Sequence, residues 1–172
     1  MNFKFLIISV VILSGFAGSA FAQQIIQLTP QEFSQEEIDE MKQKAVIITM
    51  NSGTFFIEFF PEEAPNTVHN FLELVESGYY DGTVFHRIIP GFMIQGGDPN
   101  TKDPDFDQRL WGQGGPGHQI NEEFNSIQHD RGVVSMARGD HKDSAGSQFF
   151  IVHKDSPHLD GKYTVFGRLV PG

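Results

Sequence analysis

The stretch FHRIIPGFMIQGGD, from Phe85 to Asp98, decides both the fold and the chemistry that this sequence predicts. It places one guanidinium, Arg87, close in sequence to the apolar pair Phe92 and Met93 and to one amide, Gln95. The residues between them are mostly aliphatic, glycine or proline, and no nucleophile lies within reach. We therefore expect a buried cation beside an apolar pocket, an arrangement that fits a reaction in which no covalent bond is made or hydrolysed.

Two further blocks follow in the chain, SAGSQFFIV from Ser144 to Val152 and LDGKYTVFG from Leu159 to Gly167. With the first stretch they closely resemble, in the same order, the signatures of cyclophilins, the peptidyl-prolyl cis-trans isomerases. The resemblance runs from about residue 45 to about residue 170. It implies an all-β fold with minor helix, an antiparallel eight-stranded barrel capped by helices. The many short strands by themselves leave a barrel and a sandwich equally open.

The resemblance also implies the roles of individual residues. Arg87 is the expected catalytic donor, and an apolar slot lined by Phe92, Met93, Phe150 and Leu159 is expected to take the proline ring of the substrate. Gln95 is expected to hold the substrate backbone, and further residues form the rim of the pocket or contact the substrate. The expected substrate-binding residues are Phe92, Met93, Gln95, Ala137, Arg138, Gly139, Gln148, Phe150, His158, Leu159 and Tyr163.

Two positions and one loop depart from the pattern of the best-known eukaryotic members. His158 stands where many of them carry tryptophan, a residue tied to tight cyclosporin binding, so we expect weakened cyclosporin sensitivity. Tyr163 stands where histidine is common, and both substitutes are aromatic rings with a polar edge, so we expect turnover to survive. The loop 138–144 differs in composition and length.

The same residues also fit an interpretation without a functional site. Phe92, Met93 and Phe150 fit a simple hydrophobic core, which is the usual place of such side chains. Arg87 fits a surface ion pair equally well when it is taken alone. Their occurrence together, in the order of the family, favours a site.

The histidines and serines do not form another catalytic motif. The seven histidines are scattered, without an HxH or HExxH spacing, so we expect neither a metal nor any other cofactor. Ser144, Ser147 and His153 lack the GxSxG pattern of a nucleophile elbow. The glycine-rich run 112–117 is interpreted as a long turn, since no helix-opening Lys-Ser/Thr follows it.

Residues 1–22 are interpreted as a secretory signal peptide. Lys4 gives a short positive region, a nearly continuous apolar run follows to Phe16, and Ala20-Phe21-Ala22 is a small-x-small cleavage site. The alternative is a membrane anchor, but the run is short for a span of about 20 residues. We therefore expect export to a periplasm or to the outside of the cell, with no membrane contact after cleavage.

The rest of the chain divides at about residue 45. Residues 23–44 are polar and lack glycine, and Ser34 with Glu37 forms a capping box that predicts a short helix to about Gln43. We interpret this segment as a tether or a helix lying loosely on the domain, or alternatively as a docking arm. Residues 45–172 form the predicted isomerase domain, with one helix over 64–77 and short strands at 46–48, 54–60, 85–88, 93–97, 133–137, 148–152 and 164–169.

Family members usually continue beyond the segment that matches residues 166–172, with a further helix and a closing strand. The sequence stops there, so we expect an incomplete barrel whose closing strand is missing, and a longer native protein. If the missing strand prevents folding, the chain is an inactive fragment.

Composition bears on the partners. The chain has 12 basic and 22 acidic residues, a formal charge of −10, which disfavours nucleic acid and anionic lipid. It has no cysteine, and its length predicts one domain, which we expect to be a monomer. The expected partners are proline-containing, unfolded or flexible segments of other exported proteins. The rival from another class is a binding module that grips proline-containing peptides without turnover.

Overall fold

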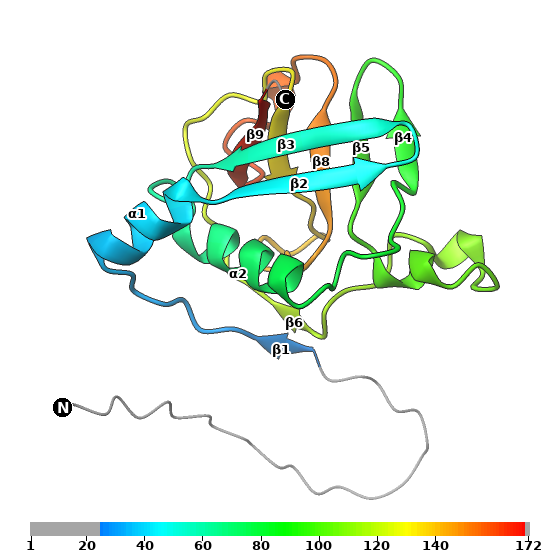
Figure 1. Cartoon of the computed structure of the whole chain (residues 1–172), viewed down its shortest axis with the longest axis horizontal. Helices are drawn as coiled ribbons and strands as arrows, with labels where there is room; N and C mark the ends of the chain where they lie inside the picture. The colour runs from blue at the N-terminus through cyan, green and yellow to red at the C-terminus, as the bar shows by residue number, and fades with distance from the viewer. Residues whose placement is uncertain (1–24, 171–172) are drawn as a thin grey trace, which may run out of the picture.

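One curled antiparallel sheet dominates the computed structural model, which describes residues 25–170. Its seven strands follow the order β2-β3-β9-β7-β8-β5-β4 (Figure 1). The all-β class with minor helix is confirmed, and the sheet forms a half-barrel. The strands are β2 (Ala45–Met50), β3 (Gly53–Phe59), β4 (Arg87–Ile89), β5 (Met93–Gly96), β7 (Val133–Met136), β8 (Phe149–Val152) and β9 (Val165–Val170).

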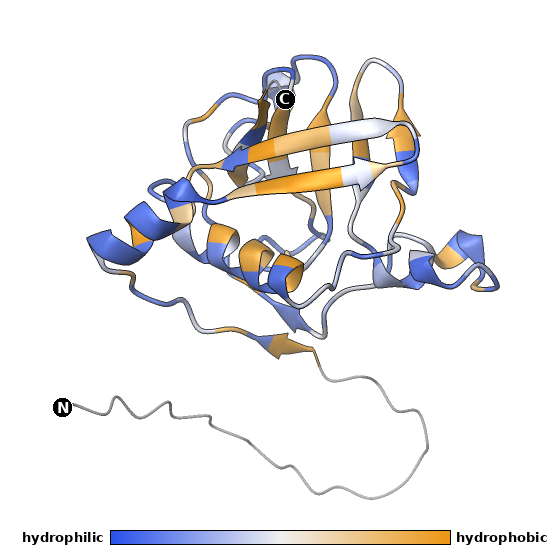
Figure 2. Ribbon diagram, in the orientation of Figure 1, coloured by the Kyte–Doolittle hydropathy of each residue, from blue (hydrophilic) through white to orange (hydrophobic). Residues whose placement is uncertain are grey.

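Each strand that the sequence predicts is present, within one or two residues at most ends. β2 and β3 form a hairpin in which Val46 lies opposite Ile57 and Ile48 opposite Phe55, with the turn at the predicted Asn51-Ser52-Gly53. Figure 2 shows that apolar residues run along both strands. The pattern of β-rich runs bounded by turn residues was therefore sufficient to locate the strands.

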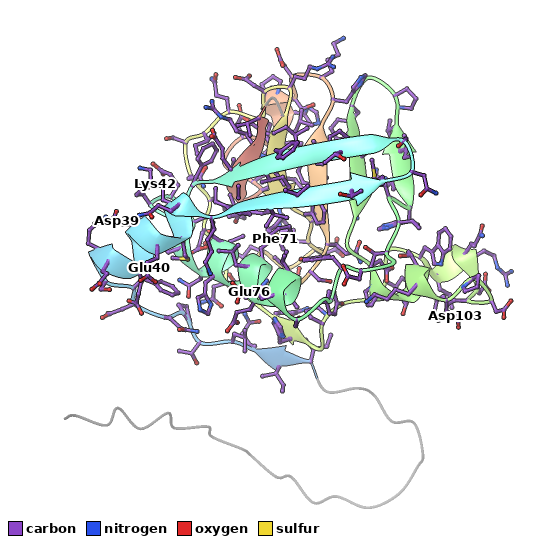
Figure 3. The ribbon with its side chains drawn as sticks, viewed as in Figure 1. Asp39, Glu40, Lys42, Phe71, Glu76 and Asp103 are labelled. Carbon is purple, nitrogen blue, oxygen red and sulfur yellow. The ribbon has the colours of Figure 1, made fainter. Side chains whose placement is uncertain are left out.

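The main core lies between one face of the sheet and helix α2 (Pro65–Glu76). Pro65 occupies the first turn, and Gly78 follows the end of the helix with a φ of 71°, a conformation that glycine adopts without steric cost. Val68 and Phe71 are buried from the helix side and Ile57 from the sheet side. Phe71 is labelled between α2 and the strands in Figure 3.

The opposite face of the sheet carries a second apolar cluster. Its buried members are Met93, Val133, Phe150, Val152, Leu159 and Val165. All four residues of β7 and all four of β8 are buried, because these central strands have packed side chains on both faces. Loops and a short 3₁₀ helix, η3 (Pro157–Leu159), cover this second face, where the predicted proline slot lies.

The segment before residue 45 is packed against the domain. Helix α1 (Gln35–Gln43) begins at the predicted capping box of Ser34 and Glu37. Its Ile38 and Met41 are 9% and 6% exposed and belong to the main core, so the expectation of a loosely lying helix is wrong. Only the tertiary structure shows that these two side chains pack into the main core.

Strand β1 (Ile26–Gln27) continues this segment along the foot of the molecule, parallel to β6 (His118–Gln119) (Figure 1). Two more 3₁₀ helices, η1 (Pro99–Lys102) and η2 (Gln108–Leu110), lie in the long connection between β5 and β6. This connection includes the glycine run 112–117.

The two edge strands of the sheet, β2 and β4, each have one neighbour among the described residues. An apolar groove of about 800 Å³ is lined by residues of both strands, and Ile47 and Ile88 on its edges are 58% and 64% exposed.

The predicted signal peptide lies outside the described residues. Within residues 25–170, no helix combines the length and the apolar character that crossing a membrane requires.

Candidate active site

A row of directly paired residues crosses the outer face of the sheet and forms the base of the site. Arg87 on β4 pairs with Gln95 on β5, Gln95 pairs with Phe150 on β8, and Phe150 pairs with Ser135 on β7. Residues that lie opposite one another in neighbouring strands share a face of the sheet, so this register gathers the cation, the amide and the aromatic ring. Met93, two residues before Gln95, continues the same face.

Arg87 is held by a chain of hydrogen bonds. Its Nη1 donates to Gln95 Oε1 at 3.3 Å, Gln95 Nε2 donates to Gln148 Oε1 at 2.9 Å, and Gln148 Nε2 donates to the carbonyl of Gly114 at 2.8 Å. Each amide has only one orientation that satisfies both of its bonds, so the chain has a fixed direction.

The expectation of a buried cation is wrong, because Arg87 is exposed. It lies on an edge strand, where no further strand covers it. Its remaining N–H groups are therefore accessible to a ligand, which a fully buried guanidinium would not be.

The predicted apolar slot is assembled beside this chain. Met93, Phe150 and Leu159 are buried, with exposed fractions of 2%, 5% and 8%. The half-buried slot residues Phe92, Ala137 and Tyr163 pack against the same cluster. The rings of Phe150 and Tyr163 make an edge-to-face contact with 5.6 Å between their centroids, which fixes the orientation of the Tyr163 ring.

His158 lies at the rim of the slot. Its ring is 5.4 Å from that of Phe92 with an interplanar angle of 35°, and the residue is exposed. The structure thus places it beside a predicted slot residue, on the side open to solvent.

A second cavity, of about 500 Å³, adjoins the slot at Ala137. It contains the other predicted contact residues, Gln95, Arg138, Gly139 and Gln148. Its opposite side is formed by the glycine run 112–117 and by Ile25, none of which the sequence analysis assigned to a site. The predicted residues therefore fall into two adjoining groups, an apolar cluster and the lining of a more polar cavity.

The guanidinium of Arg138 donates hydrogen bonds to backbone carbonyls of the protein itself. Its Nε donates to the Lys162 carbonyl at 3.1 Å and its Nη1 to the Gly139 carbonyl at 2.9 Å, while its carbon lies 4.8 Å from the ring centre of Tyr163. The side chain fastens the 138–144 loop to the wall of the slot.

A buried group behind the slot was missed by the sequence analysis. The ring of His129 stacks on Phe150, with 6.0 Å between centroids and 15° between planes. Its Nδ1 is 2.9 Å from Asp160 Oδ1 and its Nε2 is 3.1 Å from Ser135 Oγ. Hydrogen bonds from the backbone N–H and the side chain of His129 lower the pKa of Asp160, so the carboxylate stays charged.

This Asp–His–Ser order resembles that of a hydrolytic triad, but the geometry excludes that role. Ser135 is fully buried and its hydroxyl donates to the Thr164 carbonyl at 2.8 Å, so it is not presented to a substrate. The group supports Phe150 from behind. Asp160 is 31 residues from His129, and the three residues follow no short motif, so only the fold reveals the group.

Asp98 was also missed as a site residue, although it ends the deciding stretch. Its buried carboxylate accepts hydrogen bonds from the backbone N–H groups of Asn100, Gly112 and Gly114. It therefore fixes the glycine loop whose carbonyl receives Gln148. The signal in the sequence was an acidic residue directly after the apolar run and Gly96-Gly97, because a charge that becomes buried there requires hydrogen-bond partners.

Taken together, the site offers a fixed cation and an apolar slot for a ring, with a polar cavity for the flanking chain. Among residues 25–170, no three His, Asp or Glu side chains are grouped as metal ligands would be. The arrangement is suited to binding an apolar ring and to directing a hydrogen bond at a neighbouring atom.

Comparisons with known proteins agree with this geometry. The family model described as cyclophilin type peptidyl-prolyl cis-trans isomerase/CLD matches residues 45–172. Over 133 residues the chain is 49% identical to peptidyl-prolyl cis-trans isomerase B of Bacillus subtilis, covering 72% of this chain and 86% of that protein. It is 47% identical over 122 residues to a peptidyl-prolyl cis-trans isomerase of Synechococcus elongatus, covering 71% and 77%.

Other relatives are much longer. The chain is 44% identical over 146 residues to peptidyl-prolyl cis-trans isomerase-like 2 of Cryptococcus neoformans, covering 83% of this chain but only 25% of that protein.

Among solved structures, a cyclophilin type isomerase of Cryptosporidium parvum, determined in the presence of the dipeptide Ala-Pro, superimposes with a TM-score of 0.66. It is 38% identical, and the match covers 75% of this chain and 80% of that one. The sequence blocks, the fold and the grouped site residues lead to one conclusion: the chain belongs to the cyclophilin-type peptidyl-prolyl cis-trans isomerases.

Proposed function

We propose that this protein catalyses rotation of X–Pro peptide bonds between cis and trans, with Arg87 as the catalytic donor. The observation that carries the proposal is the position of Arg87, which is anchored through Gln95 and remains accessible beside the apolar slot. No cofactor is needed for a rotation about a single bond.

The chemistry follows from the peptide bond itself. Rotation meets a barrier of about 18–20 kcal/mol, because it removes the resonance of the amide. In the twisted state the lone pair localises on the proline nitrogen, which becomes a better hydrogen-bond acceptor. A donor aimed at that nitrogen stabilises the transition state more than the ground state, and only such differential binding speeds a reaction.

The slot and the amides hold the substrate during this rotation. The proline ring enters the apolar slot formed by Met93, Phe150 and their neighbours, while Gln95 holds the backbone on one side of the bond. One side of the bond is then fixed while the other side turns. The dipeptide present with the Cryptosporidium protein has proline as one of its two residues, which is consistent with a slot for that ring.

We further propose that the protein is exported and assists the folding of other exported proteins. The support is the signal-peptide pattern of residues 1–22 and the slowness of uncatalysed proline isomerisation, which takes tens to hundreds of seconds and limits folding. The partners are proline-containing flexible chains, and the protein acts as a monomer. Mass spectrometry of protein recovered outside the cytoplasm checks this: a mature N-terminus at Gln23 is expected, and an intact Met1 contradicts export.

The first test of activity is Arg87→Ala, measured by NMR exchange between cis and trans forms of a short X–Pro peptide. Removing one preorganised donor costs about 3–4 kcal/mol in other enzymes, so the rate should fall by a factor of about 10² or more. Arg87→Lys keeps the charge but loses the planar fork, and should recover only part of the rate.

Arg109→Ala is the matched control, because this arginine is 89% exposed and pairs only with Asp107. Its rate should equal that of the wild type. Peptide binding without exchange by a folded wild-type protein would contradict catalysis and favour the binding module. An unchanged exchange rate in Arg87→Ala would show that Arg87 is not the catalytic donor.

A further inference from the structure

Ile25, the residue directly before strand β1, lines the second cavity of the site. The N–H of Ile26 donates to the Gly117 carbonyl at 3.1 Å, and the N–H of Leu28 donates to the Gln119 carbonyl at 2.7 Å. The side chain of Gln27 reaches Asn121 Oδ1 at 2.9 Å. This places the preceding residue, Ile25, at the mouth of the cavity.

Contacts farther along the segment hold β1 in position. The backbone of Gln31 and the side-chain amide of Asn66 exchange hydrogen bonds of 2.7 and 3.3 Å. Phe33 packs on the ring of His69 with 5.1 Å between centroids, and α1 then enters the main core. Ile25 is thus attached to a segment that is fastened at several points.

The composition of the cavity gives Ile25 its importance. Most of the lining is polar side chains and the bare backbone of glycines, and the apolar lining residues are Ile25, Pro116 and Ala137. Ile25 is the largest of these and is 58% exposed. A substrate side chain that enters the cavity can cover part of that exposed surface, and burying apolar surface is favourable.

We propose that Ile25 is a specificity-determining residue, which favours substrates carrying an apolar side chain at one position next to the X–Pro bond. The inference rests on the proposed isomerase function, because the cavity adjoins the proline slot at Ala137. The segment before residue 45 thereby contributes to peptide selection as well as to the core.

The test compares Ile25→Ser with Ile26→Ser in the full chain. The two isoleucines are neighbours with nearly equal exposure, 58% and 60%, but successive side chains of a strand point to opposite faces and only Ile25 lines the cavity. Both substitutions leave the backbone bonds of β1 available. The reference substrate is a short peptide with one proline and alanine at every other position. In the other substrates, leucine replaces a single alanine, at one position at a time, before or after the X–Pro bond.

We expect the wild type to prefer leucine at one position, and Ile25→Ser to reduce that preference in kcat/KM by about 3- to 10-fold. Filling a fully enclosed apolar pocket with one methylene gains roughly 10-fold or more, and this wall is only partly enclosed. Turnover of the all-alanine peptide should fall less in Ile25→Ser than turnover of the leucine peptide. Ile26→Ser should keep the full preference.

Three results would overturn the inference: no leucine preference in the wild type, an unchanged preference in Ile25→Ser, or an equal loss of preference in both variants. Equal thermal midpoints of the variants separate a local effect from a loss of folding. If the wild type turns over no peptide, the isomerase proposal fails, and dissociation constants of the same peptides, measured by NMR titration, still decide the role of Ile25.

Discussion

The direction of the Arg87 side chain depends on a chain of hydrogen bonds that ends at Asp98. Gln95, the anchor of Arg87, is oriented by Gln148, and Gln148 is oriented by the carbonyl of Gly114. Asp98 in turn holds the backbone N–H of Gly114. The direction of one guanidinium is therefore set by a loop that lies some twenty-five residues farther along the chain.

Gly114→Ala tests this dependence. A Cβ at this position would lie 2.1 Å from Asp98 Oδ1, and that carboxylate is fully buried, so the loop has to move. We expect a loss of about 1–3 kcal/mol in the free energy of unfolding, as for other overpacked sites. We also expect a fall in kcat/KM of about 10-fold, through loss of one orienting hydrogen bond.

Gly115→Ala is the control for stability. A Cβ there meets nothing within 4 Å, so its unfolding free energy should match that of the wild type. Urea denaturation and peptide exchange measure both variants. Equal stability of the two variants would show that Asp98 does not constrain the loop.

Cyclosporin sensitivity also belongs to the residue scale. His158 lies exposed at the slot rim, where it packs on Phe92, and an imidazole offers less apolar surface than an indole. We expect His158→Trp to tighten inhibition relative to the wild type, in a competition assay with an X–Pro peptide. An inhibition constant of the wild type below about 100 nM, equivalent to about 9.5 kcal/mol of binding, would contradict weakened sensitivity.

Helix α1 shows how an element outside the family's matched region becomes part of the core. Only Ile38 and Met41 of its nine residues are buried, yet they pack in the same cluster as Ile57 and Phe71. The ion pairs Lys42–Glu62 and Lys44–Glu76 tie the end of the helix to the domain, although exposed pairs contribute little. The helix is thus held mainly by two side chains.

Met41→Ala measures that attachment. Truncating a buried methionine removes apolar contacts and leaves a cavity, which costs about 2–5 kcal/mol of unfolding free energy. Glu40→Ala, on the exposed side of the same helix, should change stability by less than about 0.5 kcal/mol. Chemical denaturation followed by circular dichroism gives both values. A loss below about 1 kcal/mol in Met41→Ala would mean that α1 is not anchored by this residue.

The whole molecule should lose stability as the pH falls, because two partly buried histidines resist protonation. Burial lowers the pKa of His118 from its ordinary value of 6.5, although the charge of Glu73 opposes the shift. Burial also lowers the pKa of His86. Since Asn70 Nδ2 donates to the Gly146 carbonyl, its Oδ1 faces His118 Nε2 at 2.7 Å and accepts a hydrogen bond from the N–H of that ring.

The direction of this change in stability follows from the number of protons that the folded and unfolded chains bind. The unfolded chain binds these protons at a higher pH than the folded one, so stability is complete above about pH 6.5 and falls as the pH drops below it. In urea denaturation from about pH 8 to about pH 5, His118→Gln should flatten part of this dependence. His141→Gln, at a side chain that is 75% exposed, should not. An unfolding free energy that rises on acidification over this range would contradict the lowered pKa values of His118 and His86.

At the scale of the whole molecule, and apart from the short strands β1 and β6, the sequence by itself determined the strands, both α-helices and the family. These features depend on signals within a few residues of one another: alternating apolar positions, the capping box of Ser34 and Glu37, and Pro65 and Gly78 at the ends of α2. It also named most of the residues that meet at the slot, through the resemblance of three short blocks.

Only the tertiary structure decided how those residues are presented. Arg87 is exposed because its strand lies at the edge of the sheet, which no local pattern reveals. Ile25 joins the cavity because β1 pairs with a strand more than ninety residues away, and His129 reaches Asp160 across thirty-one residues. Such contacts are selected by the packing of the whole chain, because long-range pairing depends on which surfaces remain uncovered after the local elements have formed.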